Sequence, residues 1–301
     1  MAKKTVKPIA DVPSTCDAIR ELQRQRVCNL KSRIMIENRL TATVATSTGY
    51  HAGMEEKERT ARFNEAAKVI ARVRDDREHE TDEHVAPLIL ATSGAIDGFD
   101  VQVKAYEKEM EKLAKQLPVA VWLAEPEQRG FGMLSLAKIV GECGDLNNYA
   151  APGKLWRRMG CAPFESKGKM RMPSTWRGSK PSLTAAEWEE CGYSPRRRSV
   201  AYLIGDGLVK QNAGGPYRAR YDDVKLGCQT KHPEWDWKKC DVCKGAGCEK
   251  CYDTGRKCGH AHNHAMLLAT KLLLKCLWIE WTGGDGEFET ARNHAALPVC
   301  V

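Results

Sequence analysis

Hydrophobic residues recur at helical spacing through most of the first 118 residues, and this periodicity is the strongest constraint on the fold. It predicts an amphipathic helix over 15–40, a second, highly charged helix from 55 to about 83, and a third over 100–117. The small, polar and β-branched residues at 41–53 predict a connection. Pro118 is expected to end the third helix, because proline lacks the N–H of a helix interior. Residues 1–118 are therefore expected to form a helical linker or coiled-coil arm.

Shorter elements with more glycine and proline follow from residue 119, and they predict a globular domain over 119–281 and a tail over 282–301. Gly130 and Gly132 form a Gly-x-Gly turn before an amphipathic helix, a pattern similar to a helix-hairpin-helix. Backbone N–H groups at such a helix start can bind phosphate, although a plain turn between helices is the alternative. Aromatic residues make up only 7% of the chain, and helix-forming residues are abundant. The fold class predicted is mainly α.

Positive charge is concentrated in one segment. The chain carries a formal net charge of +8, yet residues 154–220 alone hold 14 Lys/Arg against 5 Asp/Glu. Such an excess favours a phosphate-bearing partner, and DNA is the first expectation. A solvated basic face is the alternative. The candidate nucleic-acid-binding residues, besides the two glycines, are Lys154, Arg157, Arg158, Lys167, Lys169, Arg171, Arg177, Arg196, Arg197, Arg198, Arg218 and Arg220.

The first expected helix also has a basic face, for which we favour the opposite interpretation. Alternating charges along a helix are typical of a solvated coiled coil, and nucleic-acid contact is the alternative here. The residues concerned are Arg20, Arg24, Arg26, Lys31, Arg33 and Arg39.

The sequence contains no segment that predicts membrane insertion. Its start is charged with no apolar core behind it, and the most apolar run, 265–281, is interrupted by Lys271 and Lys275. We expect a cytoplasmic protein, in which most of the 13 cysteines are reduced thiols.

Four cysteines form the sharpest chemical motif of the chain: Cys240, Cys243, Cys248 and Cys251. Two Cys-x-x-Cys pairs supply the four thiolates that a structural zinc ion prefers, so we predict a small zinc-binding insertion at about 228–262. A redox dithiol and chance clustering are the alternatives. Cys258 and His260 are candidates for an additional metal contact, whereas His262 and His264 have either a metal or a packing role.

Several segments in order carry a resemblance to a known family. These are 136–145, 154–163, 166–169, 196–202 and 216–221. Their series resembles the C-terminal domain of the bridge-RNA-guided insertion-sequence transposases. The helix over 264–281 is similar to the last helix of that domain, and 19–40 is similar to the linker before it. The resemblance implies DNA as substrate and a structured guide RNA. Separately, the N-terminal helices are candidates for forming a homo-oligomer.

The departures from that family concern its chemistry. The family has a RuvC-like domain whose acidic tetrad holds a divalent metal such as Mg²⁺, and no such tetrad is evident here. Asp97 and Asp100 are the only acidic pair beside an expected strand, and loop or cap roles suffice for them. If catalysis occurs, a separate RuvC-like chain would have to supply the metal-binding carboxylates.

Ser166 matches the position of the family's serine nucleophile, in a turn where Lys167 replaces the first glycine and Gly168 keeps the second. Ser174 and Ser179 are weaker candidates, and a serine in a flexible basic loop is the alternative. The leading hypothesis is a transposase-like or recombinase-like DNA-binding protein, and whether it is an enzyme stays open. The alternatives are a non-catalytic DNA- or RNA-binding module and a zinc-stapled structural or adaptor protein.

Overall fold

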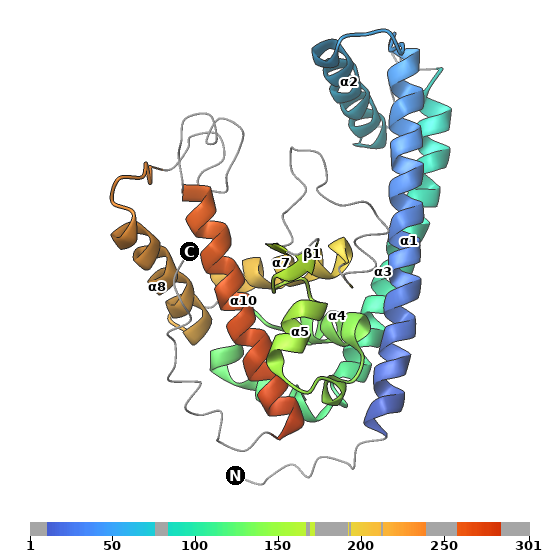
Figure 1. Ribbon diagram of the computed structural model, residues 1–301. Coiled ribbons are helices and arrows are strands. Elements are labelled where there is room, and N and C mark those ends of the chain that lie inside the picture. Colours follow the sequence, from blue (N-terminus) through green and yellow to red (C-terminus); the bar gives the residue numbers. More distant parts are fainter. Residues whose placement is uncertain are drawn as a thin grey trace. The chain divides into compact units, whose positions relative to one another are not determined.

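The computed structural model describes residues 11–75, 84–166, 169–171, 192, 194–211, 213–238 and 258–283, and it is mainly helical, as predicted (Figure 1). The chain divides into two compact units. One comprises Glu21–Met110, here called the arm, and the other comprises Met1–Arg20 with Glu111–Val301, here called the main unit. No described helix is long and apolar enough to cross a membrane.

Three helices build the arm: α1 (Val12–Ser47), α2 (Glu56–Asp75) and α3 (Ala86–Ala114). α1 and α3 run side by side in opposite directions, because Arg26 pairs with Glu107 while Arg33, seven residues later, pairs with Asp100 (Figure 1). Their hydrophobic core, shared with α2, consists of Leu40, Val44, Ala45, Ala66, Val69, Val73, Val85, Ile89 and Ile96.

Two predictions for the arm are wrong in their boundaries. The connection expected at 41–53 begins only after Ser47, because Val44 and Ala45 are buried in the core and threonine hydroxyls such as that of Thr41 bond carbonyls four residues back. α3 begins at Ala86 rather than near 100, so Asp97 and Asp100 lie within a helix and not beside a strand. They form ion pairs instead of caps, Asp97 with Arg74 at 3.0 Å and Asp100 with Arg33 at 2.8 Å.

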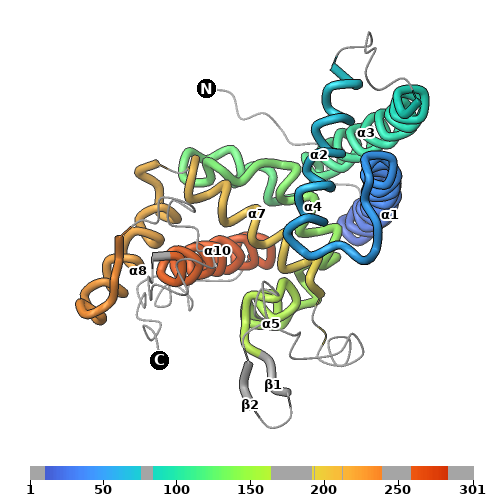
Figure 2. The backbone as a smooth tube through the Cα atoms, turned by 90° about the horizontal axis from the view of Figure 1, so that it is seen from above, coloured from blue at the N-terminus to red at the C-terminus, as the bar shows by residue number. Residues whose placement is uncertain are grey.

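The main unit surrounds its last helix, α10 (Cys258–Thr282), which is longer than the 264–281 expected. It lies against α8 (Pro216–Lys231), α7 (Pro195–Gln211) and α5 (Pro152–Arg158) (Figure 2). Three indole N–H groups tie α10 to residues 145–156. Trp156 donates to the Lys271 carbonyl, Trp278 to the Tyr149 carbonyl and Trp281 to the Asp145 carboxylate, at 2.8–3.0 Å.

The remaining elements of the main unit are short. Three 3₁₀ turns, Pro118–Ala120, Trp122–Ala124 and Pro126–Gln128, lead to α4 (Met133–Cys143), and a fourth, Leu146–Asn148, leads to α5. Leu136, Ile139 and Val140 of α4 are fully buried. β1 (Phe164–Ser166) and β2 (Lys169–Arg171) form a two-stranded antiparallel hairpin. Because 3₁₀ turns precede the Gly-x-Gly turn, the helix-hairpin-helix is not confirmed.

Glycines let α7 approach its neighbours closely. A Cβ atom at Gly205 would collide with the side chain of Thr270 on α10, and a Cβ at Gly130 would lie 3.0 Å from the Gly207 carbonyl oxygen. Gly130 also has a φ of +94°, which disfavours any other residue. Gly130 therefore has a packing role against α7, whereas a Cβ at Gly132 would meet no atom within 4 Å.

Candidate nucleic-acid interface

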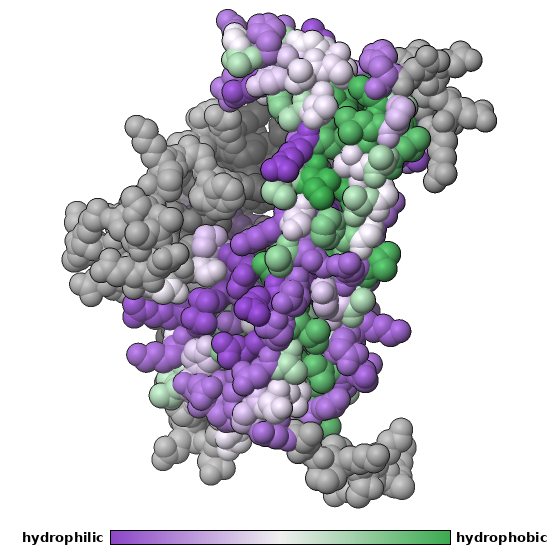
Figure 3. Space-filling model, turned by 90° about the vertical axis from the view of Figure 1, so that its right-hand side faces the viewer, coloured by the Kyte–Doolittle hydropathy of each residue, from purple (hydrophilic) through white to green (hydrophobic). Residues whose placement is uncertain are grey.

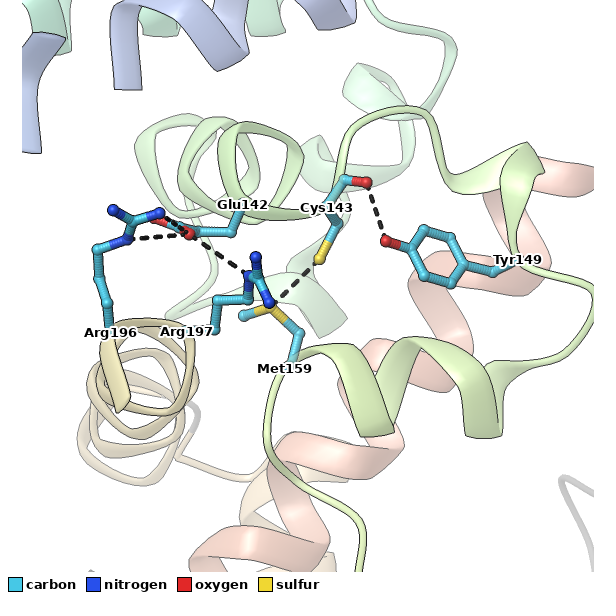
Figure 4. A network of polar contacts seen from close by, with 6 residues as sticks. All are labelled: Glu142, Cys143, Tyr149, Met159, Arg196 and Arg197. Carbon is cyan, nitrogen blue, oxygen red and sulfur yellow. Dashed lines mark hydrogen bonds and ion pairs between the residues drawn. The ribbon is translucent and has the colours of Figure 1, made fainter. Parts of the chain in front are cut away.

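A buried carboxylate organises the basic residues at the start of α7. Glu142, in the last turn of α4, is only 4% exposed. Arg196 donates two hydrogen bonds to one of its oxygens, from Nε at 3.1 Å and from Nη2 at 2.9 Å (Figure 4). The Nε of Arg197 lies 3.8 Å from the same oxygen, beyond hydrogen-bonding distance. Glu142 thus fixes the first turn of α7 against the end of α4.

The position of these arginines follows from how α7 begins. Pro195 is the first residue of the helix, a position that suits proline because its missing N–H has no partner there anyway. Arg196, Arg197 and Arg198 therefore occupy the first turn, where successive side chains diverge around the axis. Arg196 is partly exposed while its guanidinium binds Glu142, whereas Arg197 and Arg198 are half-buried.

Arg158, at the end of α5, brings a further positive charge to this place. Burial and the charge of Arg158 both lower the pKa of Arg197. Within the described residues, neither Arg158 nor Arg197 has a hydrogen-bond partner for its buried Nε. We call Glu142, Arg158, Arg196 and Arg197 the guanidinium cluster.

A second pair of cations lies beside Cys161. Arg198 donates from Nη1 to the Cys161 sulfur at 3.6 Å. Burial lowers the pKa of Lys271. The charge of Arg198 lowers this pKa further, whereas Cys161 raises it. The Lys271 ammonium lies 5.2 Å from the centre of the Trp156 ring, a cation–π contact. Positive charge therefore continues from the guanidinium cluster toward the base of the β1–β2 hairpin.

Three residues next to the guanidinium cluster, Tyr149, Cys143 and Met159, contact one another. Tyr149 donates from its hydroxyl to the Cys143 carbonyl at 2.9 Å, and the Cys143 thiol lies 3.3 Å from the Met159 sulfur (Figure 4). Burial raises the pKa of the Cys143 thiol to about 12. Cys143 is therefore a packing residue and not a nucleophile.

The hairpin places Ser166 at the end of β1, opposite Lys169 of β2. Arg171 ends β2 and pairs with Phe164. The other candidates of this turn and the loop after it, Lys167, Arg177, Ser174 and Ser179, lie outside the described residues. The structure thus places Ser166 in a strand, opposite a basic residue of the partner strand, and its role as a nucleophile stays a prediction.

The remaining basic candidates have different environments. Lys154 and Arg157 are exposed on α5. Arg218 is engaged by two neighbours, since its Nε donates to Asp222 of α8 at 2.8 Å and its Nη1 donates to the Val209 carbonyl of α7 at 2.9 Å. Arg220 is half-buried. Of the twelve basic candidates, the structure therefore brings Arg158, Arg196 and Arg197 together and places Arg198 beside Cys161, and Arg218 makes a contact between helices.

The four cysteines of the predicted zinc site lie outside the described residues, and no group of three or more metal-binding side chains occurs in the part of the chain that is described. Cys258 is the first residue of α10. His260 is exposed, with its ring edge-on to Trp235 and parallel to that of His264 at 6.4 Å. His262 shares a 2.7 Å hydrogen bond with the Tyr221 hydroxyl, which is a packing role.

Sequence reasoning missed Glu142, although a signal was present. Glu142 follows Ile139 by three residues and therefore continues the buried stripe of α4. A carboxylate on such a stripe requires a buried cationic partner, and the chain has one strongly basic segment to provide it.

Comparison with models of protein families, with curated proteins and with solved structures found no match to this chain.

Proposed function

We propose that the main unit is a DNA-binding domain of a transposase-like or recombinase-like protein, with the guanidinium cluster and the adjacent hairpin as its DNA-contacting surface. The observation that supports this most strongly is the guanidinium cluster, in which Glu142 is the single carboxylate that contacts the arginines among the described residues, and Arg198 follows in the same first turn of α7. Guanidinium groups bind phosphates through paired N–H donors. The excess of basic residues over 154–220 agrees with the same partner.

The proposed chemistry belongs to Ser166. Its Oγ attacks a DNA phosphodiester, so that a serine–phosphate bond forms and the bond from phosphorus to one deoxyribose oxygen breaks. The leaving oxygen takes up a proton as a hydroxyl, and the serine proton passes to a base. An unassisted hydroxyl is a weak nucleophile, and the nearby cations stabilise phosphoryl charge without acting as that base. The base and the carboxylates for a divalent metal would come from a separate RuvC-like chain.

Two assays test this function. Fluorescence anisotropy with duplex DNA measures binding, and log K should fall with log salt concentration by about 0.9 for each phosphate contacted. A nicked suicide substrate, supplied together with a RuvC-like chain, should trap a covalent adduct that Ser166→Ala abolishes while DNA affinity stays the same. Binding without an adduct favours the non-catalytic DNA- or RNA-binding module. A structured RNA that competes with the duplex DNA for the protein would be a candidate guide. Absence of nucleic-acid binding favours the zinc-stapled adaptor.

A structural zinc ion is part of the proposal. The donor chemistry of Cys240, Cys243, Cys248 and Cys251 fits zinc, because four thiolates form its preferred tetrahedral shell. The ion would connect the chain after Lys238 to the start of α10. Elemental analysis should find about one zinc per chain, and Cys243→Ser should lose it, whereas Cys276→Ser, outside the motif, should retain it.

A homo-oligomer formed through the arm is also proposed. Ile34 and Met35 of α1 are 50% and 47% exposed, and with Asn38 and Ala42 they line a shallow groove. Leu88, Leu90 and Val101 of α3 are further exposed apolar residues. Figure 3 shows apolar surface interspersed with polar surface on one face of the molecule. Sedimentation should show a larger species for the native chain than for Ile34→Lys.

A further inference from the structure

The first turn of α7 concentrates positive charge where a helix least tolerates it. The N-terminus of a helix carries a partial positive charge, which acidic residues usually offset. α7 has none in its first turn and has three arginines there instead. Glu142, contributed by α4, is the only acidic residue that forms an ion pair with them in the described chain.

Arg158 and Arg197 both lie near Cys143. Arg158 precedes Met159, whose sulfur is 3.3 Å from the Cys143 sulfur, and the Nε of Arg197 is 3.8 Å from Glu142, the residue before Cys143. Burial and the charge of Arg158 lower the pKa of Arg197, and each arginine has a buried Nε that donates to nothing in the described residues. One oxygen of Glu142, Oε2, accepts two hydrogen bonds from Arg196. Buried donors without acceptors cost free energy, so this arrangement favours an anion that accepts from both arginines.

We propose that Arg158 and Arg197 form a binding site for one phosphate group, with Glu142 as a positioning residue that holds the first turn of α7 in place. A phosphate carries several acceptor oxygens, so it can accept hydrogen bonds from two guanidinium groups at once. Its charge also offsets the positive end of α7. The side chain of Arg197 is 17% exposed and that of Arg196 is 46% exposed, which leaves the cluster open to solvent on this side.

This inference rests on the proposed function for its source of phosphate, which is the nucleic-acid backbone. Free phosphate or a phosphorylated metabolite has the same chemistry. The test therefore uses both inorganic phosphate and duplex DNA, with Arg158→Met as the main variant. Methionine keeps the apolar stem of arginine but removes the charge. Arg157→Met is the matched control, because Arg157 is the preceding residue of the same helix and is exposed.

The first experiment compares the melting temperature of the protein in phosphate with that in chloride at equal ionic strength. The native chain and Arg157→Met should both be stabilised by phosphate, and Arg158→Met should lose that response. Arg158→Lys keeps the charge without the paired donors, so it should retain a weakened response. A full response in Arg158→Met, with circular dichroism showing an unchanged helical content, would overturn the proposal.

The second experiment measures the salt dependence of duplex DNA binding. If the site holds a backbone phosphate, Arg158→Met should make the slope of log K against log salt concentration shallower by about 0.9. An unchanged slope, together with an unchanged phosphate response, contradicts the site but leaves the DNA-binding function intact. A lost phosphate response in a chain that binds no DNA contradicts the proposed function and supports a site for a free phosphate compound.

Discussion

Three arginines of the arm each have their own carboxylate partner, whereas the arginines of the guanidinium cluster outnumber the carboxylates that contact them. In the arm, Arg26, Arg33 and Arg74 each pair with a carboxylate of α3, at distances of 2.7–3.0 Å. In the main unit, Arg196 and Arg197 share Glu142, and neither Arg158 nor Arg198 has an ion pair in the described chain. Paired arginines have a structural role, whereas arginines that outnumber their carboxylates remain available to bind an anion.

This difference separates two basic segments that look alike in sequence. Both segments are rich in arginine, with five arginines in residues 15–40 and nine in residues 154–220. Only the partners supplied by other elements distinguish them, and these partners lie 67–81 residues away in the arm, as for Arg33 with Asp100 and Arg26 with Glu107. The structure agrees with the interpretation that the arm's basic face belongs to a helical pair.

The largest expected effect is that of removing Glu142. Glu142→Ala leaves Arg196 and Arg197 without their carboxylate, and truncating one partner of a buried ion pair costs about 3 kcal/mol. Asp100→Ala in the arm removes a partly exposed partner of Arg33, and such pairs contribute about 1 kcal/mol or less. Urea denaturation measures both. Equal losses in the two variants would contradict the contrast between the regions.

Packing provides the second comparison, through two helical glycines. Gly205→Ala should destabilise the main unit by about 2 kcal/mol, because the added Cβ has no room beside Thr270 and overpacking has costs of this size. Gly98→Ala, in α3 of the arm, meets no atom within 4 Å. It should stabilise by up to about 1 kcal/mol, because alanine favours a helix more than glycine. Thermal denaturation of the two variants, each measured against the native chain, tests the pair, and stabilisation by Gly205→Ala would mean that α7 and α10 are not closely packed.

The third prediction concerns DNA binding by the arm. Arg33→Met should reduce stability by about 0.5–1 kcal/mol, the contribution of a partly exposed ion pair, and it should leave the salt dependence of DNA binding unchanged. Anisotropy titrations at several salt concentrations measure this. A shallower slope for Arg33→Met would show that the arm contacts DNA, and its basic face would then have to be counted with that of the main unit.

The helical character of the chain could be predicted from sequence because it depends on local periodicity. The helix expected after Gly132 is present as α4, and Leu136, Ile139 and Val140, which the spacing puts on one face, are buried. The boundaries of α1 and α3 could not be predicted, because they depend on tertiary burial. Val44 and Ala45 extend α1 into a stretch whose composition favours a loop, and Ile89 and Ile96 extend α3 back to Ala86.

The candidate site could be predicted only as a set of residue types. Sequence identified Arg158 and Arg196–Arg198 as basic candidates, but it could not show which of them meet or which are already engaged. That outcome depends on Glu142, whose burial is set by the packing of α4 against α7, and on Asp222, which engages Arg218. The role of Ser166 stays a prediction, because it depends on a base that another chain would supply.

The smallest expected effect concerns thiol reactivity. The Cys143 thiol, beside the guanidinium cluster, has a pKa raised to about 12 by burial, so at pH 8 only about 10⁻⁴ of it is the reactive thiolate. The positive charges of Arg158 and Arg197 lower this pKa but do not overcome the burial.

Cys28 in the arm is exposed. Brief treatment of the native chain with iodoacetamide at pH 8, followed by peptide mass spectrometry, should therefore find label on Cys28 and little on Cys143. Denaturation in urea should make the two equally reactive. Strong labelling of Cys143 in the native chain would show that the Cys143 thiol is readily exposed to solvent. The fixed placement of Arg197 beside Glu142 would then be wrong.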